Sequence, residues 1–554
     1  MRTAAPSTKR SAASLEPDLS SPSQQNRLAR AAASAGAATM TSRVLGLARD
    51  QLLASLFGAG DAMDAFNVAF RIPNLVRDLF AEGAMSAAFV PVFMRQLALG
   101  DREAAWRLAN NVINALLVVT GVLVVLGILF ARPLVGAFAA DYADVPGKLE
   151  LTVLLTRIML PFLTLVAVAA VSMGMLNSLQ RFFVPALAPA MFNIATILCA
   201  LLLVPVMPRL GLPPIAAIAA GALLGGVAQI ALQWPLLRRE GFSYAAFLNW
   251  KQEGLRRMLM LMGPGTIGLA ATQVNVFVNT VLATREGTGA VSWLNYAFRL
   301  MYLPTGLFGV SIATAVIPAV SRCAARDDHA GVRATLAEGL SLMFVMNVPA
   351  TIGLIALSHP IVRVIFERRA FLPSDTAATA AALQYYAVGL LGYSIVRIAS
   401  PTFYALGDSR TPVQISMASV GVNAVLNVVL ARLLGYGGLA LGTSIAALFN
   451  AGSLLWLLHG RLDGLEDRRV VSSLARIVIA SLVMGTAALV VNGALGTWMP
   501  GDTFARQAIR LFLSIVAALL VLGIAAHVLR IREFREAVTL ALTRLRAGAS
   551  ADPP

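Results

Sequence analysis

The chain has 554 residues, of which 58% are hydrophobic and only 13% are charged, and its mean hydropathy is +0.75. A soluble domain carries roughly a quarter of its residues as charged side chains, so this composition excludes an ordinary soluble protein and indicates an integral membrane protein. The net charge of +16 does not indicate nucleic-acid binding, because the cations lie in short loops between apolar runs rather than in a basic domain.

The first segment, residues 1–28, is rich in Ser, Ala, Pro and Gln and is predicted to be a disordered cytoplasmic tail. Hydropathy then predicts an all-α, multi-pass membrane protein with about fourteen transmembrane helices of roughly 20 residues each. We expect these spans near residues 33–58, 63–96, 107–131, 150–176, 184–207, 213–236, 256–283, 290–318, 335–358, 377–406, 412–432, 438–459, 470–493 and 505–529.

An internal repeat groups these spans. The residues Asn67 to Arg71 (NVAFR) recur as Asn295 to Arg299 (NYAFR), and Pro185 after Leu179 recurs as Pro412 after Leu406. Because the repeat interval covers six spans, an even number, the two halves are expected to be parallel repeats related by an axis along the membrane normal. The sequence therefore predicts two six-helix pseudo-symmetric lobes, an N-lobe at 29–240 and a C-lobe at 241–462, then two helices at 463–530 and a cytoplasmic tail at 531–554.

The loops expected on the side of the N-terminus carry most of the basic residues. The opposite loops are poorer in cations, with one exception, the group Arg363, Arg368 and Arg369. Because basic loops stay in the cytoplasm, both termini are predicted to be cytoplasmic.

Charges occur inside three predicted spans. The first span contains Arg43, Arg49 and Asp50. A charge near the centre of a membrane helix costs about 2.5–3.5 kcal/mol, whereas each Leu or Val contributes only about 0.3–0.6 kcal/mol in the other direction. The charged side chains of this span therefore pair with polar groups of other helices, or the span lines a water-filled cavity.

The second span places a row of polar residues on one helical stripe, and the eighth span has Arg299 alone in an apolar run. The stripe consists of Asp64, Arg71, Asn74, Asp78 and Glu82. One interpretation is that these charges pair internally, for example Arg49 or Arg71 with Asp64, and merely lock helices together. The whole set fits better with a polar cavity between the lobes, whose cations suit a phosphate-bearing substrate.

The sequence contains no recognisable metal-binding or nucleotide-binding motif. The two cysteines and four histidines have no metal-ligand spacing, and the pair Gly147-Lys148 is followed by Leu149 rather than by the Ser or Thr of a nucleotide-binding loop. We therefore expect no metal, no cofactor and no enzymatic activity.

Several motifs resemble those of the lipid II flippase family MurJ (MviN). They are Ser42-Arg43-Val44-Leu45-Gly46 through Arg49-Asp50, Asp64-Ala65-Phe66, Pro73-Asn74-Leu75 and Phe80-Ala81-Glu82-Gly83-Ala84, with further matches through Asn177, Arg181, Phe182, Pro185, Pro189, Gln273, Asn279, Ser292-Trp293, Arg299-Leu300, Phe403-Tyr404-Ala405 and Thr411-Pro412. The resemblance implies the fold of the multidrug/oligosaccharidyl-lipid/polysaccharide (MOP) exporters, in which the last two helices shape a groove for a polyprenyl tail.

The resemblance also implies roles for individual residues. Arg43, Arg49 and Arg299 match essential cavity arginines, and Asp64 matches an essential cavity acid. Arg77 and Glu82 match polar residues of the cavity and its lateral portal, and the secondary cavity candidates are Ser42, Arg71, Asn74 and Asp78.

Two positions depart from the family. The acids that the family commonly has before and three residues after Arg299 are here Phe298 and Tyr302. We therefore expect the charge of Arg299 to be balanced from elsewhere, for example by the substrate.

The resemblance implies that lipid II, an undecaprenyl-pyrophosphate-linked disaccharide-pentapeptide, is flipped across the bacterial inner membrane by alternating access. The expected partners are lipid II, membrane lipids and the cell-wall synthesis machinery, without nucleic acid, and the expected state is a monomer. Two alternatives remain, a flippase for another polyprenyl-linked glycan and a multidrug or cation antiporter of the same superfamily. The antiporter would favour acids over arginines in its cavity.

Overall fold

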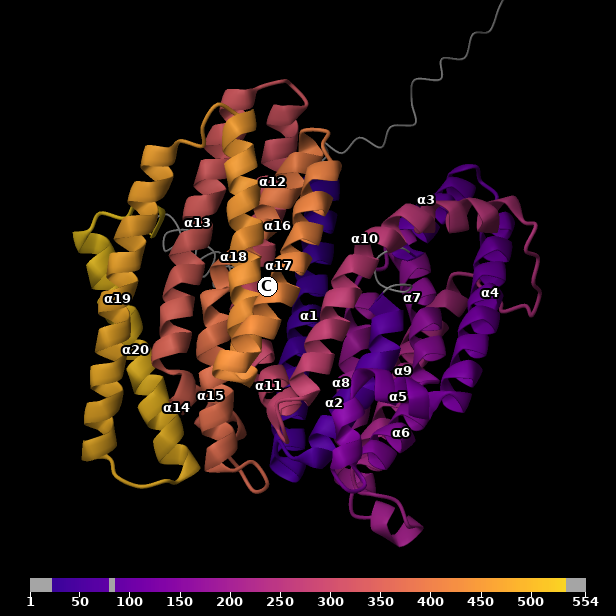
Figure 1. The fold of residues 1–554 in the computed structure, drawn as a ribbon. Coiled ribbons are helices and arrows are strands. Elements are labelled where there is room, and N and C mark those ends of the chain that lie inside the picture. Colours follow the sequence, from indigo (N-terminus) through magenta and orange to yellow (C-terminus); the bar gives the residue numbers. More distant parts are fainter. Residues whose placement is uncertain (1–21, 79–84, 535–554) are drawn as a thin grey trace, which may run out of the picture.

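The computed structural model describes residues 22–78 and 85–534, and within them every regular element is a helix (Figure 1). The first half comprises α1 (Pro22–Phe57), α2 (Asp61–Arg77), α3 (Met85–Ala98), α4 (Arg102–Leu129), α5 (Ala131–Phe138), η2 (Ala140–Asp144), α6 (Lys148–Met159), α7 (Phe162–Ser178), α8 (Phe183–Leu203), η3 (Met207–Leu210) and α9 (Ala216–Arg239). The second half comprises α10 (Glu253–Thr284), α11 (Ala290–Pro304), the π-helical turn η4 (Thr305–Gly309), α12 (Val310–Ala324), α13 (His329–Ala356), α14 (Ser358–Phe366), α15 (Pro373–Val388), α16 (Leu390–Ala405), α17 (Arg410–Leu434) and α18 (Tyr436–Arg461). Two long helices follow, α19 (Asp467–Trp498) and α20 (Phe504–Val528).

The predicted spans correspond to single helices or to consecutive helix pairs. Ten helical segments in the described part of the chain are long and apolar enough to cross a membrane. The other four expected spans fall on α1, on α2 with α3, on α10, and on α11 with α12. These four do not meet the same criterion, so the all-helical membrane fold is confirmed but the count of fourteen is not.

The element order confirms the internal repeat. Helix α13 begins and ends 227 positions after α4, and α17 begins 227 positions after α8. The short helix α14 likewise begins 227 positions after α5. In both halves the last two helices pack against each other, α8 with α9 and α17 with α18. At the edge of the second half α19 packs against α20 and α13, and α20 also contacts α14 (Figure 1).

Two boundaries differ from those expected. Helix α1 begins at Pro22, so residues 22–28 are helical rather than part of a disordered tail; residues 1–21 and 535–554 lie outside the described residues. The second span is not one continuous helix either, since α2 ends at Arg77 and α3 begins at Met85. Residues 79–84 between them are not described.

The bundle has two ends, seen at the top and bottom of Figure 1. The "basic end" carries the α3–α4, α9–α10, α12–α13 and α18–α19 connections, where the arginine-rich loops lie. The "opposite end" carries the α1–α2, α10–α11 and α19–α20 connections. Here the halves touch through the backbone, because the amide of Ala370 donates to the carbonyl of Ser55 at 3.2 Å.

Gly58 makes this contact possible, and its replacement by alanine is expected to destabilise the protein. Its φ is +62°, and an added Cβ would overlap the carbonyl oxygen of Ala370. A left-handed backbone costs alanine about 1–2 kcal/mol, so we expect a lower thermal unfolding temperature in detergent. Gly60→Ala is the control, because Gly60 has a negative φ and no atom near its would-be Cβ. Equal stability of the two variants would contradict the prediction.

Candidate functional site between the two halves

A carboxylate on α1 joins two of the predicted arginines. Arg49 donates from Nη2 to Asp50 Oδ1 at 2.8 Å, and Arg299 on α11 donates from Nη1 to Asp50 Oδ2. The side chains of Arg49 and Asp50 are 11% and 6% exposed, whereas that of Arg299 is 45% exposed. Arg299 is thus balanced from elsewhere in the chain, because α1 supplies the acid that its own helix does not.

Arg71 lies beside this group. Its Nη2 is 3.4 Å from Oδ1 of Asn295, one turn before Arg299 on α11. Arg299 is near enough to repel both Arg49 and Arg71 electrostatically. Arg71 and Arg299 are also the equivalent positions of the repeat, so the pseudo-symmetry itself brings the two cations together.

Arg43 lies further toward the basic end. Its guanidinium packs against Gly306 in η4, so closely that a Cβ at Gly306 would overlap it. Arg43 precedes Asp50 by seven residues, and Gly306 follows Arg299 by seven, so α1 runs antiparallel to α11 and η4. The two segments meet through long side chains.

A further cation, Arg397 on α16, was missed by the sequence analysis. It donates to the hydroxyl of Tyr302, its guanidinium lies 5.6 Å from the Tyr302 ring centroid, and it flanks Gly309 in η4. Tyr302, where the family has an acid, thus contacts an arginine, and Phe298 stacks on Tyr302 at 5.8 Å. The available signal was an arginine within the apolar span expected at 377–406.

Three of these arginines interact electrostatically and the other two flank η4, so we call the five the arginine cluster: Arg43, Arg49, Arg71, Arg299 and Arg397. In residues 22–78 and 85–534, Asp50 is the only carboxylate in an ion pair with any of the five. Arginine keeps its charge when desolvated and offers a planar fork of donors that matches phosphate oxygens. The cluster is therefore suited to bind a phosphate-bearing anion.

Asp64 does not belong to the arginine cluster. It is fully buried, with Oδ2 3.2 Å from Lys148 Nζ and 2.7 Å from the amide of Gly289. Its Oδ1 accepts from the amide of Ser292 at 3.0 Å and from the Ser292 hydroxyl at 2.7 Å. Lys148 also reaches Asp61 at 2.7 Å and is itself almost completely buried. Asp64 therefore joins the two halves near the opposite end.

Lys148 is the second residue that the sequence analysis missed as a partner, because it stands outside the predicted stripe. Ser292 is the repeat equivalent of Asp64, 228 positions later, and Asn67 also donates to the Ser292 hydroxyl at 3.1 Å. The first turns of the repeat-related helices α2 and α11 thus meet at the pseudo-symmetry axis. Neither Arg49 nor Arg71 pairs with Asp64, contrary to the alternative considered from the sequence.

Among the remaining candidates, Asp78 and Arg77 lie near enough to Arg71 to act on it electrostatically, Asp78 as an attraction and Arg77 as a repulsion. Arg77 pairs with its neighbour Asp78 at 2.7 Å at the end of α2, and Asn74 donates to the carbonyl of Phe70 at 2.9 Å. Ser42 accepts through its backbone carbonyl from Asn193 on α8 at 2.9 Å. Glu82 lies outside the described residues.

Comparisons with known proteins agree on one family. Residues 53–509 match the family described as "Lipid II flippase MurJ". The "Probable lipid II flippase MurJ" of Vibrio cholerae is 35% identical over 482 residues, which cover 85% of this chain and 91% of that protein. The "Lipid II flippase MurJ" of Burkholderia cenocepacia is 36% identical over 431 residues, covering 77% and 82%.

Solved structures give the same result. A "Lipid II flippase MurJ, inward closed conformation" has a TM-score of 0.72 at 26% identity and covers 89% of this chain and 99% of that one. An inward-facing multidrug resistance MATE transporter of the MOP superfamily has a TM-score of 0.64 at 15% identity over 77% of this chain and 96% of that chain, a likeness of fold alone. These matches over most of the chain show that it belongs to the lipid II flippase MurJ family.

Proposed function

We propose that this protein flips lipid II from the inner to the outer leaflet of the bacterial inner membrane for peptidoglycan synthesis. The observation that carries the proposal is the excess of arginine over acid in the arginine cluster, in a chain of the MurJ family. The pyrophosphate of lipid II is the group that such a cluster would bind, through parallel N–H donors. Arg299 is the first candidate for binding the pyrophosphate, because its side chain is exposed and its hydrogen bond to Asp50 occupies only Nη1.

The contacts between the halves suggest how access alternates. The hydrogen bonds of Asp64 with Gly289 and Ser292 hold the halves together at the opposite end, as does the hydrogen bond from Ala370 to Ser55. If the basic end faces the cytoplasm, as the positive-inside rule requires, the substrate headgroup enters from that end, and these contacts break when the protein opens outward. Both chain termini are then cytoplasmic.

The two last helices supply a surface for the polyprenyl tail. Helices α19 and α20 pack together at the edge of the second half, and their outer faces carry exposed apolar residues, among them Val490, Phe512, Leu520 and Ile524. Movement of the anionic headgroup outward is favoured by an inside-negative potential at about 2.3 kcal/mol per charge per 100 mV. The proposed process forms and breaks no covalent bond, so the protein acts as a transporter rather than as an enzyme. A monomer is sufficient for it, because one copy of the chain contains both halves.

Depletion of the protein in living cells tests the proposal. We expect lipid II to accumulate and to become inaccessible to a reagent that modifies it only in the outer leaflet. Re-expression of the chain should restore access. Unchanged access of lipid II after depletion, with another polyprenyl-linked glycan retained instead, would favour a flippase for that glycan. A multidrug antiporter would change drug efflux and leave both lipids unaffected.

A further inference from the structure

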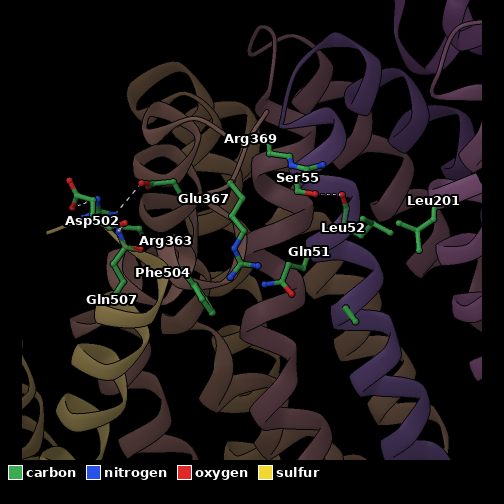
Figure 2. Close-up of a pocket in the computed structure, with 12 residues that line it drawn as sticks. Gln51, Leu52, Ser55, Leu201, Arg363, Glu367, Arg369, Asp502, Phe504 and Gln507 are labelled. Carbon is green, nitrogen blue, oxygen red and sulfur yellow. Dashed lines mark hydrogen bonds and ion pairs between the residues drawn. The ribbon is translucent and has the colours of Figure 1, made fainter. Parts of the chain in front are cut away.

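One group of arginines has no role in the proposed transport site. Arg363, Arg368 and Arg369 lie at the opposite end, where the positive-inside rule disfavours cations. They line a groove of about 760 Å³, a volume typical of ligand-binding pockets, between α1, the end of α8, the loop after α14 and the start of α20 (Figure 2). The groove therefore spans both halves of the fold at the end that faces outward in the proposed orientation.

Arg363 is already satisfied by acids. Its Nε donates to Glu367 at 3.1 Å, and its Nη2 donates to Asp502 at 2.8 Å. These are the two carboxylates that line the groove, so the lining has one more cation than anions. The remaining positive charge belongs to Arg368 and Arg369.

Neither of these two arginines has an acidic partner in the described part of the chain. Arg368 donates one hydrogen bond to the carbonyl of Val364 at 2.9 Å, and its guanidinium lies 4.2 Å from the centroid of the Phe504 ring. Arg369 is exposed, and its side chain is drawn among the lining residues in Figure 2. Two arginines on adjacent positions thus present free N–H donors to one groove.

The rest of the lining is apolar or neutral. Leu52 and Leu201 form one wall and Phe504 another, and both Leu201 and Phe504 are largely exposed. Ala48 and the neutral polar residues Gln51, Ser55 and Gln507 complete the lining. A ligand that fits this surface combines an anionic group with an apolar part.

We propose that this groove binds the phosphate of a lipid headgroup in the outer leaflet, held by Arg368 and Arg369 with the acyl or prenyl chain against Leu201 and Phe504. Arginine forms charge-assisted bonds to phosphate, which are stronger than neutral hydrogen bonds. The site is distinct from the arginine cluster, and its occupancy does not depend on transport. Two lipids share the required chemistry, an anionic phospholipid and the polyprenyl pyrophosphate of a translocated substrate.

Binding by the purified full chain in detergent tests this proposal. The probe is short-chain phosphatidylglycerol, titrated by isothermal calorimetry. The double variant Arg368→Gln/Arg369→Gln is expected to bind it about tenfold more weakly. The matched control is Arg132→Gln/Arg209→Gln, which removes two exposed cations from the same end but outside the groove. An equal loss of affinity in the control variant would overturn the proposal, because any exposed cation at this end would then serve as well.

A variant with the opposite effect guards against misfolding as an explanation. Asp502→Ala removes an exposed acid from the groove and frees Nη2 of Arg363, so it is expected to tighten binding severalfold. Unchanged affinity in this variant would also count against the site. A parallel titration with a short-chain polyprenyl pyrophosphate identifies the occupant: a loss confined to this probe in the double variant indicates translocated substrate, and a similar loss for both probes indicates any lipid phosphate. Loss for neither probe refutes the site, whatever the result of the transport assay.

Discussion

Arg299→Ala is expected to abolish complementation of cells depleted of the protein, while the variant still accumulates in the membrane. Arg299 is more exposed than Arg49 and Arg71, the other two arginines near Asp50. It lies on α11 in the second half and pairs with Asp50 on α1 in the first half. Loss of one charge-assisted hydrogen bond costs about 1.5–3 kcal/mol, roughly tenfold to a hundredfold in substrate affinity. The measurement is growth on depletion together with binding of lipid II by purified protein.

Arg285→Ala is the matched control, because Arg285 is an exposed arginine at the end of α10 whose partner, Asp141, is 3.4 Å away. It should complement normally. Arg299→Lys separates two roles of Arg299. If the guanidinium binds pyrophosphate through two parallel donors, lysine should bind lipid II about tenfold more weakly, because an ammonium cannot reproduce that geometry. If Arg299 only neutralises Asp50, lysine should retain native affinity, and the proposed substrate contact fails.

Lys148→Met is expected to cause the largest loss of stability. The ammonium of Lys148 is 2% exposed and lies 3.2 Å from the fully buried Asp64. Removing one partner of a buried ion pair leaves an uncompensated charge and typically costs about 3–5 kcal/mol. We expect a large fall in the thermal unfolding temperature in detergent, and lower accumulation in the membrane.

The double variant Lys148→Met/Asp64→Asn should recover part of this loss. The amide of asparagine is neutral and keeps one acceptor oxygen for Ser292, but its NH2 group then faces the amide of Gly289, so the recovery is only partial. Arg132→Gln is the control, because the exposed pair of Arg132 with Glu150 at 3.5 Å contributes at most about 1 kcal/mol. A double variant less stable than Lys148→Met would contradict the prediction that the unpaired charge of Asp64 causes the loss of stability.

The membrane class, the repeat and the cationic character of the site follow from the sequence by local rules. Hydropathy sums the transfer free energies of neighbouring residues, so it identifies α13 or α20 without reference to any other helix. It is less effective for α1 and α11, because charges such as Arg49 and Arg299 reduce the apolar signal. Those same charges marked both helices as functional, and the repeat of NVAFR as NYAFR located the second half.

The pairing of charges was decided by the tertiary structure alone. Asp50 reaches Arg299 from 249 positions away, and Asp64 finds Lys148 rather than Arg49 or Arg71. Helical periodicity places a side chain on a face but does not say which helix crosses that face. The same holds for Arg397, whose place beside the other arginines is evident only from its contact with Tyr302 on another helix. A buried charge is stable only with a partner at hydrogen-bond distance, and that distance is set by the packing of helices whose sequences are far apart.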